Sequence, residues 1–165
     1  MTETMTTGAV LAGKYLTFKV AEEEYGIQIL KVQEIIPMQS ITKVPKMPEF
    51  VRGVINLRGK VIPVIQLRSK FGLASAADNE KTCVIVVQIG NSGAQATLGV
   101  VIDEVKEVLD IKADSIEDTP SFGGNVNTDL LLGMSKIGTS VKILLDIDRV
   151  LTAEEIVRIK QPVAS

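Results

Sequence analysis

The stretch VRGVINLRGKVIPVIQL, residues 51–67, decides how this chain folds. Its two apolar runs, 51–57 and 61–67, are rich in Val and Ile, which favour β-strands. Between them, Gly59 supplies the unusual φ angle that a tight hairpin turn needs. The pattern therefore predicts an antiparallel β-hairpin. Because Pro63 cannot donate a backbone hydrogen bond, we expect the second strand to lie at a sheet edge or a bulge.

Similar apolar runs on both sides of this hairpin predict an all-β chain. We expect one clear helix, Ala153–Lys160, because Thr152 and Glu155 form a capping box at its start. Pro48 is expected to begin a single helical turn at 48–50. The predicted strands are 14–20, 25–29, 32–37, 41–44, 51–57, 61–67, 82–89, 97–102, 105–109, 130–137 and 141–147.

The two halves of the chain resemble each other. Residues 25–36 align with 98–109, and residues 53–67 align with 133–147 without a gap. The first alignment preserves four identical pairs, Gly26/Gly99, Ile29/Ile102, Val32/Val105 and Glu34/Glu107.

This repeat predicts two small antiparallel β-barrels of about five strands each, within one domain at 14–160. The expected halves are 14–73 and 82–151, separated by the small, polar linker 74–80. Either half alone would be marginally stable, so we expect the two to share a buried interface. The sequence leaves open whether hairpins are exchanged between the barrels.

The remaining residues, 1–13 and 161–165, are expected to be tails, the first of them disordered. No positive charge precedes Lys14, which argues against a signal peptide, and no apolar run reaches the roughly 20 residues of a membrane span. Cys83 is the single cysteine, so an intramolecular disulfide is excluded. We expect Cys83 to be a core residue and the compartment to be reducing.

The composition argues against nucleic-acid binding and against catalysis. The chain has 18 basic and 20 acidic residues and no basic tract, whereas a nucleic-acid-binding barrel needs a basic face with stacking aromatic residues. His is absent, which removes the commonest general base and zinc ligand. We expect no catalytic, cofactor or metal site. The alternative is a small enzyme that uses carboxylates, which would require a deep pocket with converging acidic side chains.

Three segments carry a resemblance to a known family. These are RGVINLRGKVIPVIQLR at 52–68, EEYGIQILKVQEI at 23–35 and LGVVIDEV at 98–105. They resemble the CheW family of bacterial chemotaxis coupling proteins, and the similarity extends over about 14–160. The resemblance implies two SH3-like five-stranded barrels packed side by side with a short C-terminal helix, and no enzymatic activity.

The resemblance also implies partners and a location. Members of the family link the cytoplasmic tips of transmembrane chemoreceptors to the regulatory domain of the histidine kinase CheA. We therefore expect a cytoplasmic protein that is recruited to membrane-associated receptor arrays, without inserting into the membrane and without a small-molecule substrate. The length favours a dedicated coupling protein over a regulatory domain of CheA or a coupling protein with a receiver domain.

Five residues of the first half are implied in receptor binding. An apolar groove would accept a face of the receptor helix, Gly53 would allow close backbone approach, and Arg58 would set the register by a charge-assisted hydrogen bond. The alternatives are a core role for Val32, a bulge at Gly53 and a turn cation at Arg58. The implied receptor-binding residues are Val32, Glu34, Gly53, Asn56 and Arg58.

Contact with the kinase is implied on the second half, with one barrel end against another. Phe122 is the strongest candidate, because a large apolar ring stands there in a polar loop; the alternative is an anchor on the chain's own barrel. The family often has a basic residue five positions earlier. This chain has Glu117 there, followed by Asp118, so the expected charge at the kinase contact is reversed.

Overall fold

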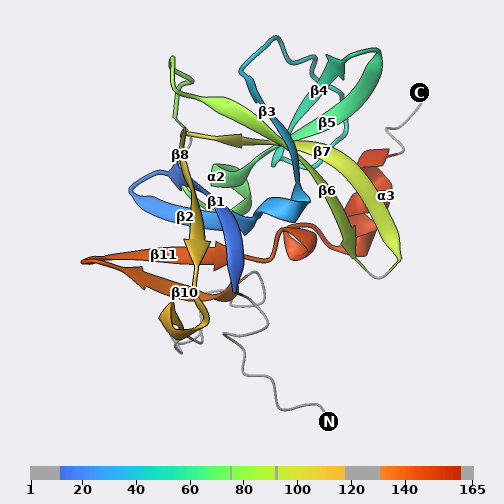
Figure 1. The fold of residues 1–165 in the computed structure, drawn as a ribbon. Coiled ribbons are helices and arrows are strands. Elements are labelled where there is room, and N and C mark those ends of the chain that lie inside the picture. Colours follow the sequence, from blue (N-terminus) through green and yellow to red (C-terminus); the bar gives the residue numbers. More distant parts are fainter. Residues whose placement is uncertain (1–11, 75, 92, 118–130, 161–165) are drawn as a thin grey trace.

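The computed structural model describes residues 12–74, 76–91, 93–117 and 131–160, and two β-sheets dominate it (Figure 1). Sheet A has six strands in the order β8-β1-β2-β11-β10-β9, and sheet B has five in the order β3-β6-β7-β5-β4. The strands are β1 (Gly13–Val20), β2 (Glu23–Gln28), β3 (Val32–Pro37), β4 (Val51–Leu57), β5 (Lys60–Gln66), β6 (Cys83–Asn91), β7 (Ala94–Ile102), β8 (Glu104–Ile111), β9 (Ile116–Glu117), β10 (Leu131–Ile137) and β11 (Ser140–Leu145).

Short helical segments complete the described chain. They are the 3-10 turns η2 (Ile29–Lys31), η3 (Ala113–Ser115) and η5 (Ile147–Arg149), and the helices α2 (Leu67–Lys70) and α3 (Ala153–Lys160). The predicted all-β class with one C-terminal helix is confirmed. Sheet A has one strand more than expected, because the two-residue β9 pairs with β10.

The capping box of α3 is confirmed atom by atom. The Glu155 backbone N–H donates to Thr152 Oγ1 at 3.1 Å, and the Thr152 N–H donates to Glu155 Oε1 at 2.9 Å. These two bonds satisfy amide groups that the helix itself cannot pair. The apolar side of α3 is buried through Ile156 and Ile159, which belong to the main core.

The chain crosses between the sheets twice. Sheet B is one continuous stretch, β3 to β7, whereas sheet A consists of β1 and β2 together with β8 to β11. The blue hairpin β1–β2 therefore lies beside the orange hairpin β10–β11 (Figure 1). Two parallel pairs, β2–β11 and β5–β7, join strands from different halves. Each half of the repeat thus contributes strands to both sheets.

The repeat is visible in the strand pairing itself. Gly26 is paired with Leu144 in sheet A, and Gly99 is paired with Val64 in sheet B. These are equivalent positions in the two sequence alignments. A Cβ at residue 99 would lie 2.6 Å from Val84 Cγ1, and a Cβ at residue 26 would lie 3.2 Å from Leu144 Cδ2. Glycine therefore occupies the same crowded place in both parallel pairs.

One core is shared by the two sheets. It contains Phe18 and Ile27 from sheet A, Ile85 and Val100 from sheet B, and Ile156 from α3, each almost fully buried. The core contains residues of both sequence halves, 14–73 and 82–151. Burying an aliphatic or aromatic side chain contributes about 1.5–3 kcal/mol, so this shared core is the main favourable term that holds the sheets together.

Each sheet also has its own smaller cluster, and the two clusters differ in polarity. Sheet B places Ile55 and Ile62 in its cluster. The aligned positions in sheet A hold Ser135 and Lys142, which are also buried. Lys142 Nζ makes an ion pair with the Glu24 carboxylate on the neighbouring strand.

Several local expectations were wrong. Residues 41–44 form no strand, only the single bridge Thr42–Val54. Residues 48–51 form one hydrogen-bonded turn, in which the Val51 N–H donates to the Pro48 carbonyl at 3.0 Å, and no helix follows it. β5 lies inside sheet B rather than at its edge. Pro63 is accommodated because the ladder to β7 begins at the next residue, Val64, so that no donor is needed from the proline.

At the ends of predicted elements, smaller differences appear. The first strand begins at Gly13, inside the expected tail, and most of both tails lies outside the described residues. Leu67 begins α2 instead of ending a strand. Cys83 is partly rather than fully buried; it packs against the shared core, and burial raises the pKa of its thiol.

The Glu24–Lys142 pair predicts an acid-dependent contribution to stability. The hydrogen bond from Lys142 lowers the pKa of the Glu24 carboxyl. A carboxyl with a lowered folded pKa stabilises the fold above its unfolded pKa of about 4.3, and this contribution is lost as pH falls through the folded pKa. Lys142→Met should lower the free energy of unfolding by about 1–2 kcal/mol at pH 7, and this difference should shrink below about pH 4.

Urea denaturation between pH 3 and pH 7 measures this effect. Lys14→Met is the matched control, because the Lys14 side chain is 63% exposed and its Nζ is as far as 4.0 Å from Asp110 Oδ2. Such an exposed pair should contribute little at any pH. An equal loss of stability at pH 3 and pH 7 for Lys142→Met would contradict the assignment.

Candidate functional site

A shallow depression lies between β3, β6 and the tip of the β4–β5 hairpin. Its volume is about 320 Å³. It brings together Glu34 and Arg58, two of the five predicted receptor-binding residues. The lining residues are Gln33, Glu34, Leu57, Arg58, Lys60, Ile62, Gln88 and Thr97.

The hairpin turn presents Arg58 to this depression. Arg58 and Gly59 both have positive φ angles, 51° and 87°. Two such residues in succession are typical of the type I′ turn, which matches the twist of paired strands. Asn56 Oδ1 accepts a hydrogen bond from the Gly59 N–H at 2.9 Å. Asn56 therefore supports the turn that carries Arg58.

Arg58 and Glu34 form a two-point ion pair. Arg58 Nη1 donates to Glu34 Oε1 at 3.1 Å, and Nη2 donates to Oε2. The Arg58 side chain is 71% exposed, whereas that of Glu34 is 26% exposed. Hydrogen bonding to Glu34 raises the pKa of the Arg58 guanidinium, so Arg58 stays charged. The pair joins the edge strand β3 to the hairpin tip at the other side of sheet B.

Apolar groups lie beside this ion pair. The floor of the depression includes Ile62, which is 5% exposed. A second hollow of about 710 Å³ shares Lys60, Ile62, Gln88 and Thr97 with the first and extends to Ile159 of α3. Val61 in this second hollow is 69% exposed. The outer surface of sheet B thus combines one charged pair, several amides and exposed aliphatic groups.

Gly53 and Val32 lie outside the lining of the smaller depression. Gly53 sits at a bulge of β4, with φ +145°, where an added Cβ would overlap the Thr42 carbonyl oxygen. The Thr42 and Val54 backbones exchange hydrogen bonds of 2.9 and 2.8 Å at this point. The close approach at Gly53 is therefore made by the chain's own loop. Val32 is partly buried and packs against the shared core.

Of the two residues expected at the kinase contact, the structure describes Glu117 but not Phe122. Glu117 lies on β9, opposite Met134 of β10, and its carboxylate is 2.9 Å from Lys136 Nζ. Both side chains are more than half exposed. The negative charge at Glu117 is therefore partly balanced within the chain. Phe122 and Asp118 lie outside the described residues.

Sequence reasoning missed the polar residues that surround Arg58. Gln88 comes from the second half of the sequence and reaches the depression because β6 pairs with β3. Gln33 Nε2 is 3.5 Å from Gln88 Oε1 across this pair. No local pattern marks these amides, since only the strand pairing places them together. Lys60 could have been included, because it follows the same turn as Arg58.

Neither hollow has the arrangement of an acid–base site. The larger one contains no carboxylate in its lining, and the smaller one contains Glu34 alone. Asp146 does have a raised pKa, caused by burial and by the neighbouring Asp148, but it lies at η5 and lines neither hollow. Within the described ranges, no three His, Cys, Asp or Glu side chains are placed to hold a metal ion.

Comparison with known proteins decides the family. Residues 14–155 match the model of the CheW-like domain. The chain belongs to the CheW-like family. The resemblance seen in the sequence is thereby confirmed.

Relatives match over most of their length. The chemotaxis protein CheW of Klebsiella aerogenes is 39% identical over 148 residues, which cover 90% of this chain and 87% of that protein. The Helicobacter pylori CheW is 35% identical and covers 84% and 81%. The crystal structure of the scaffolding protein TtCheW from Thermoanaerobacter tengcongensis has a TM-score of 0.74 at 36% identity, covering 85% and 92%. The two sheets accordingly correspond to two SH3-like subdomains.

The bulge at Gly53 predicts that substituting Gly53 costs much more stability than substituting Gly59 at the tip of the same hairpin. Gly53→Ala should lower the free energy of unfolding by about 3 kcal/mol, because the new methyl group meets the Thr42 carbonyl and the φ angle is unfavourable for alanine. Gly59→Asn is the control, since nothing lies within 4 Å of its Cβ position and asparagine tolerates positive φ. Its cost should be about 1 kcal/mol or less. Urea denaturation compares the two, and equal costs would refute the role given to the Thr42 contact.

Proposed function

We propose that this chain is a non-catalytic adaptor that couples transmembrane chemoreceptors to the histidine kinase CheA in chemotaxis. The observation that carries the proposal is the surface depression bridged by Glu34 and Arg58, on a chain of the CheW-like family. Relatives carry the names chemotaxis protein CheW and scaffolding protein, which fits a role in assembling other proteins.

The outer surface of sheet B is the proposed receptor site. Arg58 projects into solvent and can donate further hydrogen bonds to a carboxylate or carbonyl of a receptor helix, because a guanidinium has five N–H donors. Ile62 and the exposed Val61 offer apolar contact beside it. Helices bind such grooves through apolar residues at spacings of three and four, with polar contacts that set the register. Val32, Gly53 and Asn56 would then support the site rather than contact the receptor.

The proposed kinase contact includes Glu117 on sheet A, and Phe122, which lies outside the described residues. Glu117 and Lys136 form an exposed pair of opposite charges at the β9–β10 edge, which can exchange partners with a charged surface on CheA. The regulatory domain of CheA is the expected partner here. Receptor and kinase would thus occupy different sheets, as an adaptor requires.

A cytoplasmic location at receptor arrays is part of the same proposal. In the part of the chain that the structure describes, no helix has the length and apolar character needed to cross a membrane. Recruitment to the membrane would then come from binding the receptor. The competing enzyme hypothesis needs converging carboxylates in a deep pocket. The larger hollow has no carboxylate and the smaller has Glu34 alone; a third hollow beside β4 holds Glu49 and Asp78, of which Asp78 is paired with Arg52.

Arg58 provides the sharpest test of the receptor site. Arg58→Ala should weaken binding to a soluble receptor cytoplasmic fragment about tenfold, because a charge-assisted contact is lost at an exposed position. The fold should be unaffected. Arg149→Ala is the matched control, since Arg149 is similarly exposed and pairs with Asp146 outside the depression. Isothermal titration calorimetry gives both affinities, and an unchanged affinity for Arg58→Ala removes Arg58 from the site.

The adaptor role requires two partners at once. Pull-down of the purified chain with the CheA regulatory domain and the receptor fragment, separately and together, should recover both binary complexes and the ternary complex. Phe122→Ser should reduce recovery of the kinase complex and leave the receptor complex intact. Recovery of neither partner by the unmodified chain would reject the adaptor role while leaving the fold unchanged.

A further inference from the structure

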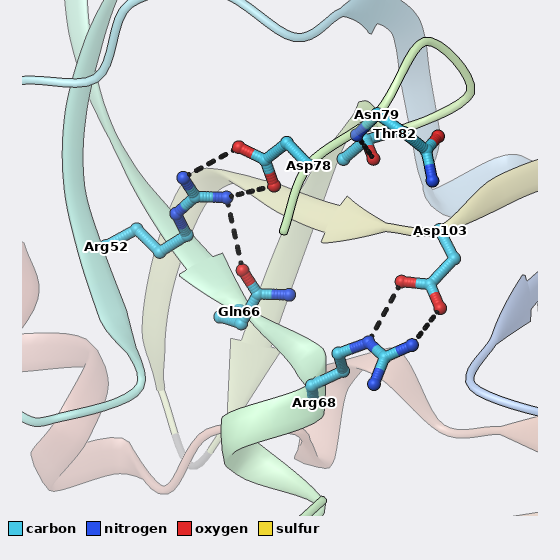
Figure 2. Close-up of polar contacts among 7 residues, drawn as sticks. All are labelled: Arg52, Gln66, Arg68, Asp78, Asn79, Thr82 and Asp103. Carbon is cyan, nitrogen blue, oxygen red and sulfur yellow. Dashed lines mark hydrogen bonds and ion pairs between the residues drawn. The ribbon is translucent and has the colours of Figure 1, made fainter. Parts of the chain in front are cut away.

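Asp103 stands where the chain passes from sheet B to sheet A, between β7 and β8. Its carboxylate accepts hydrogen bonds from Arg68 Nε at 3.2 Å and Nη2 at 2.6 Å (Figure 2). It also accepts the Ala21 N–H at 2.8 Å, in the turn between β1 and β2. The Asp103 N–H donates to the Lys19 carbonyl at 3.0 Å. One residue thus links α2, which follows sheet B, to a hairpin of sheet A.

This link is partly buried. The side chains of Arg68 and Asp103 are 16% and 25% exposed. Burial by itself would raise the pKa of the Asp103 carboxyl, but the bonds from Arg68 and Ala21 outweigh it and lower the pKa. Arg68 Nη1 also donates to the Ala74 carbonyl at 2.9 Å. Several bonds converge on two side chains, which distinguishes this group from an isolated surface ion pair.

A second group occupies the other crossing. Lys31 lies in η2, where the chain passes from sheet A to sheet B, and its Nζ is 2.7 Å from Asp148 Oδ2. Asp148 lies in η5, which follows β11 of sheet A. Its Oδ1 accepts the N–H of Gly90, on β6 of sheet B, at 3.0 Å. Again one carboxylate joins the end of one sheet to a hairpin of the other.

The two groups are related by the internal repeat. Extending the alignment of 53–67 with 133–147 by one residue pairs Arg68 with Asp148. At the crossings the alignment of 25–36 with 98–109 pairs Asp103 with Leu30, so that Lys31 stands one residue further along than Asp103. The acid stands on the crossing in one group and after the hairpin in the other. In both groups the carboxylate also accepts a hydrogen bond from a backbone N–H. Asp103, which follows sheet B, accepts from Ala21 in a hairpin of sheet A, and Asp148, which follows sheet A, accepts from Gly90 in a hairpin of sheet B. We call Arg68, Asp103 and Ala21 the Asp103 bridge, and Lys31, Asp148 and Gly90 the Asp148 bridge.

We propose that the Asp103 bridge and the Asp148 bridge together fix the angle between the two sheets. The shared core is made of aliphatic and aromatic contacts, which hold the sheets together but define direction weakly. Hydrogen bonds are directional, and two of these bridges at the two crossings restrict rotation about the core. Arg68, Asp103, Lys31 and Asp148 are therefore positioning residues.

The angle can be measured directly, without any partner. In a Cys83→Ala background, spin labels at Lys60→Cys on β5 and Lys112→Cys after β8 report the distance between the sheets by double electron–electron resonance. Both lysines are exposed. The unmodified bridges should give one narrow distance distribution. Arg68→Gln with Lys31→Gln should broaden it or shift its maximum, and each single substitution should do so to a smaller extent.

Arg52→Gln is the matched control. Arg52 makes an equally good two-point pair with Asp78, at 2.9 and 2.9 Å, and also donates to Gln66, but all three lie on sheet B and its linker (Figure 2). Its loss should leave the distance distribution unchanged. Lys31→Arg keeps the positive charge, so it should give the narrow distribution of the unmodified bridges, unlike Lys31→Gln.

A double variant with the same distribution as Arg52→Gln would overturn the proposal. Far-ultraviolet circular dichroism verifies that each labelled variant is folded. Should the double variant unfold, the two single variants decide: broadening in both supports the proposal, and broadening in neither rejects it.

The consequence for assembly rests on the proposed function. The double variant, without labels, should bind the receptor fragment and the CheA regulatory domain singly with affinities within about twofold of the unmodified chain. The ternary complex should be about five- to tenfold weaker, because a scaffold with a variable angle must be ordered before both partners fit. Broad distances with an unweakened ternary complex would keep the positioning role and reject its use in assembly. Failure of the unmodified chain to bind either partner would instead reject the proposed function.

Discussion

The shared apolar core between the sheets is the interaction on which the rest of the structure depends. Each sheet has a small cluster of its own, but the largest apolar cluster contains residues of both sheets and of α3. A unit of about half this chain buries too little surface to be stable alone. The two sheets therefore need each other, and each surface proposed to bind a partner is held in place by a core that belongs to neither sheet alone.

The crossings of the chain make this mutual dependence stronger. Because β3 to β7 form sheet B between the two parts of sheet A, the two sequence halves cannot separate without breaking the parallel pairs β2–β11 in sheet A and β5–β7 in sheet B. Glycine stands at the equivalent position of both pairs, at Gly26 and Gly99, where an added Cβ would be crowded by Leu144 and by Val84 respectively. In sheet A, Ser135 and Lys142 replace the apolar pair Ile55 and Ile62 of sheet B. The backbone arrangement thus tolerates a polar and an apolar version of the same unit.

The candidate site shows how a rigid sheet positions a few polar groups. The positive φ angles at Arg58 and Gly59, supported by Asn56, direct the guanidinium across the open side of sheet B to Glu34. The aliphatic surface around this pair is shallow and lacks converging acids, which suits protein recognition better than catalysis. Family membership and surface chemistry thus both support the proposed role as an adaptor.

Local patterns in the sequence determined the strands, the tight turn at Gly59, the capped helix α3, the internal repeat and the family. They could do so because side-chain periodicity, turn geometry and capping depend on residues close together in the chain. Only the tertiary structure decided which strands pair, why Gly53 is needed against Thr42, how Gln88 comes to lie near Glu34, and where Asp103 and Asp148 join the sheets. These contacts connect residues far apart in the sequence, and their partners are selected by the closure of the shared core rather than by any local preference.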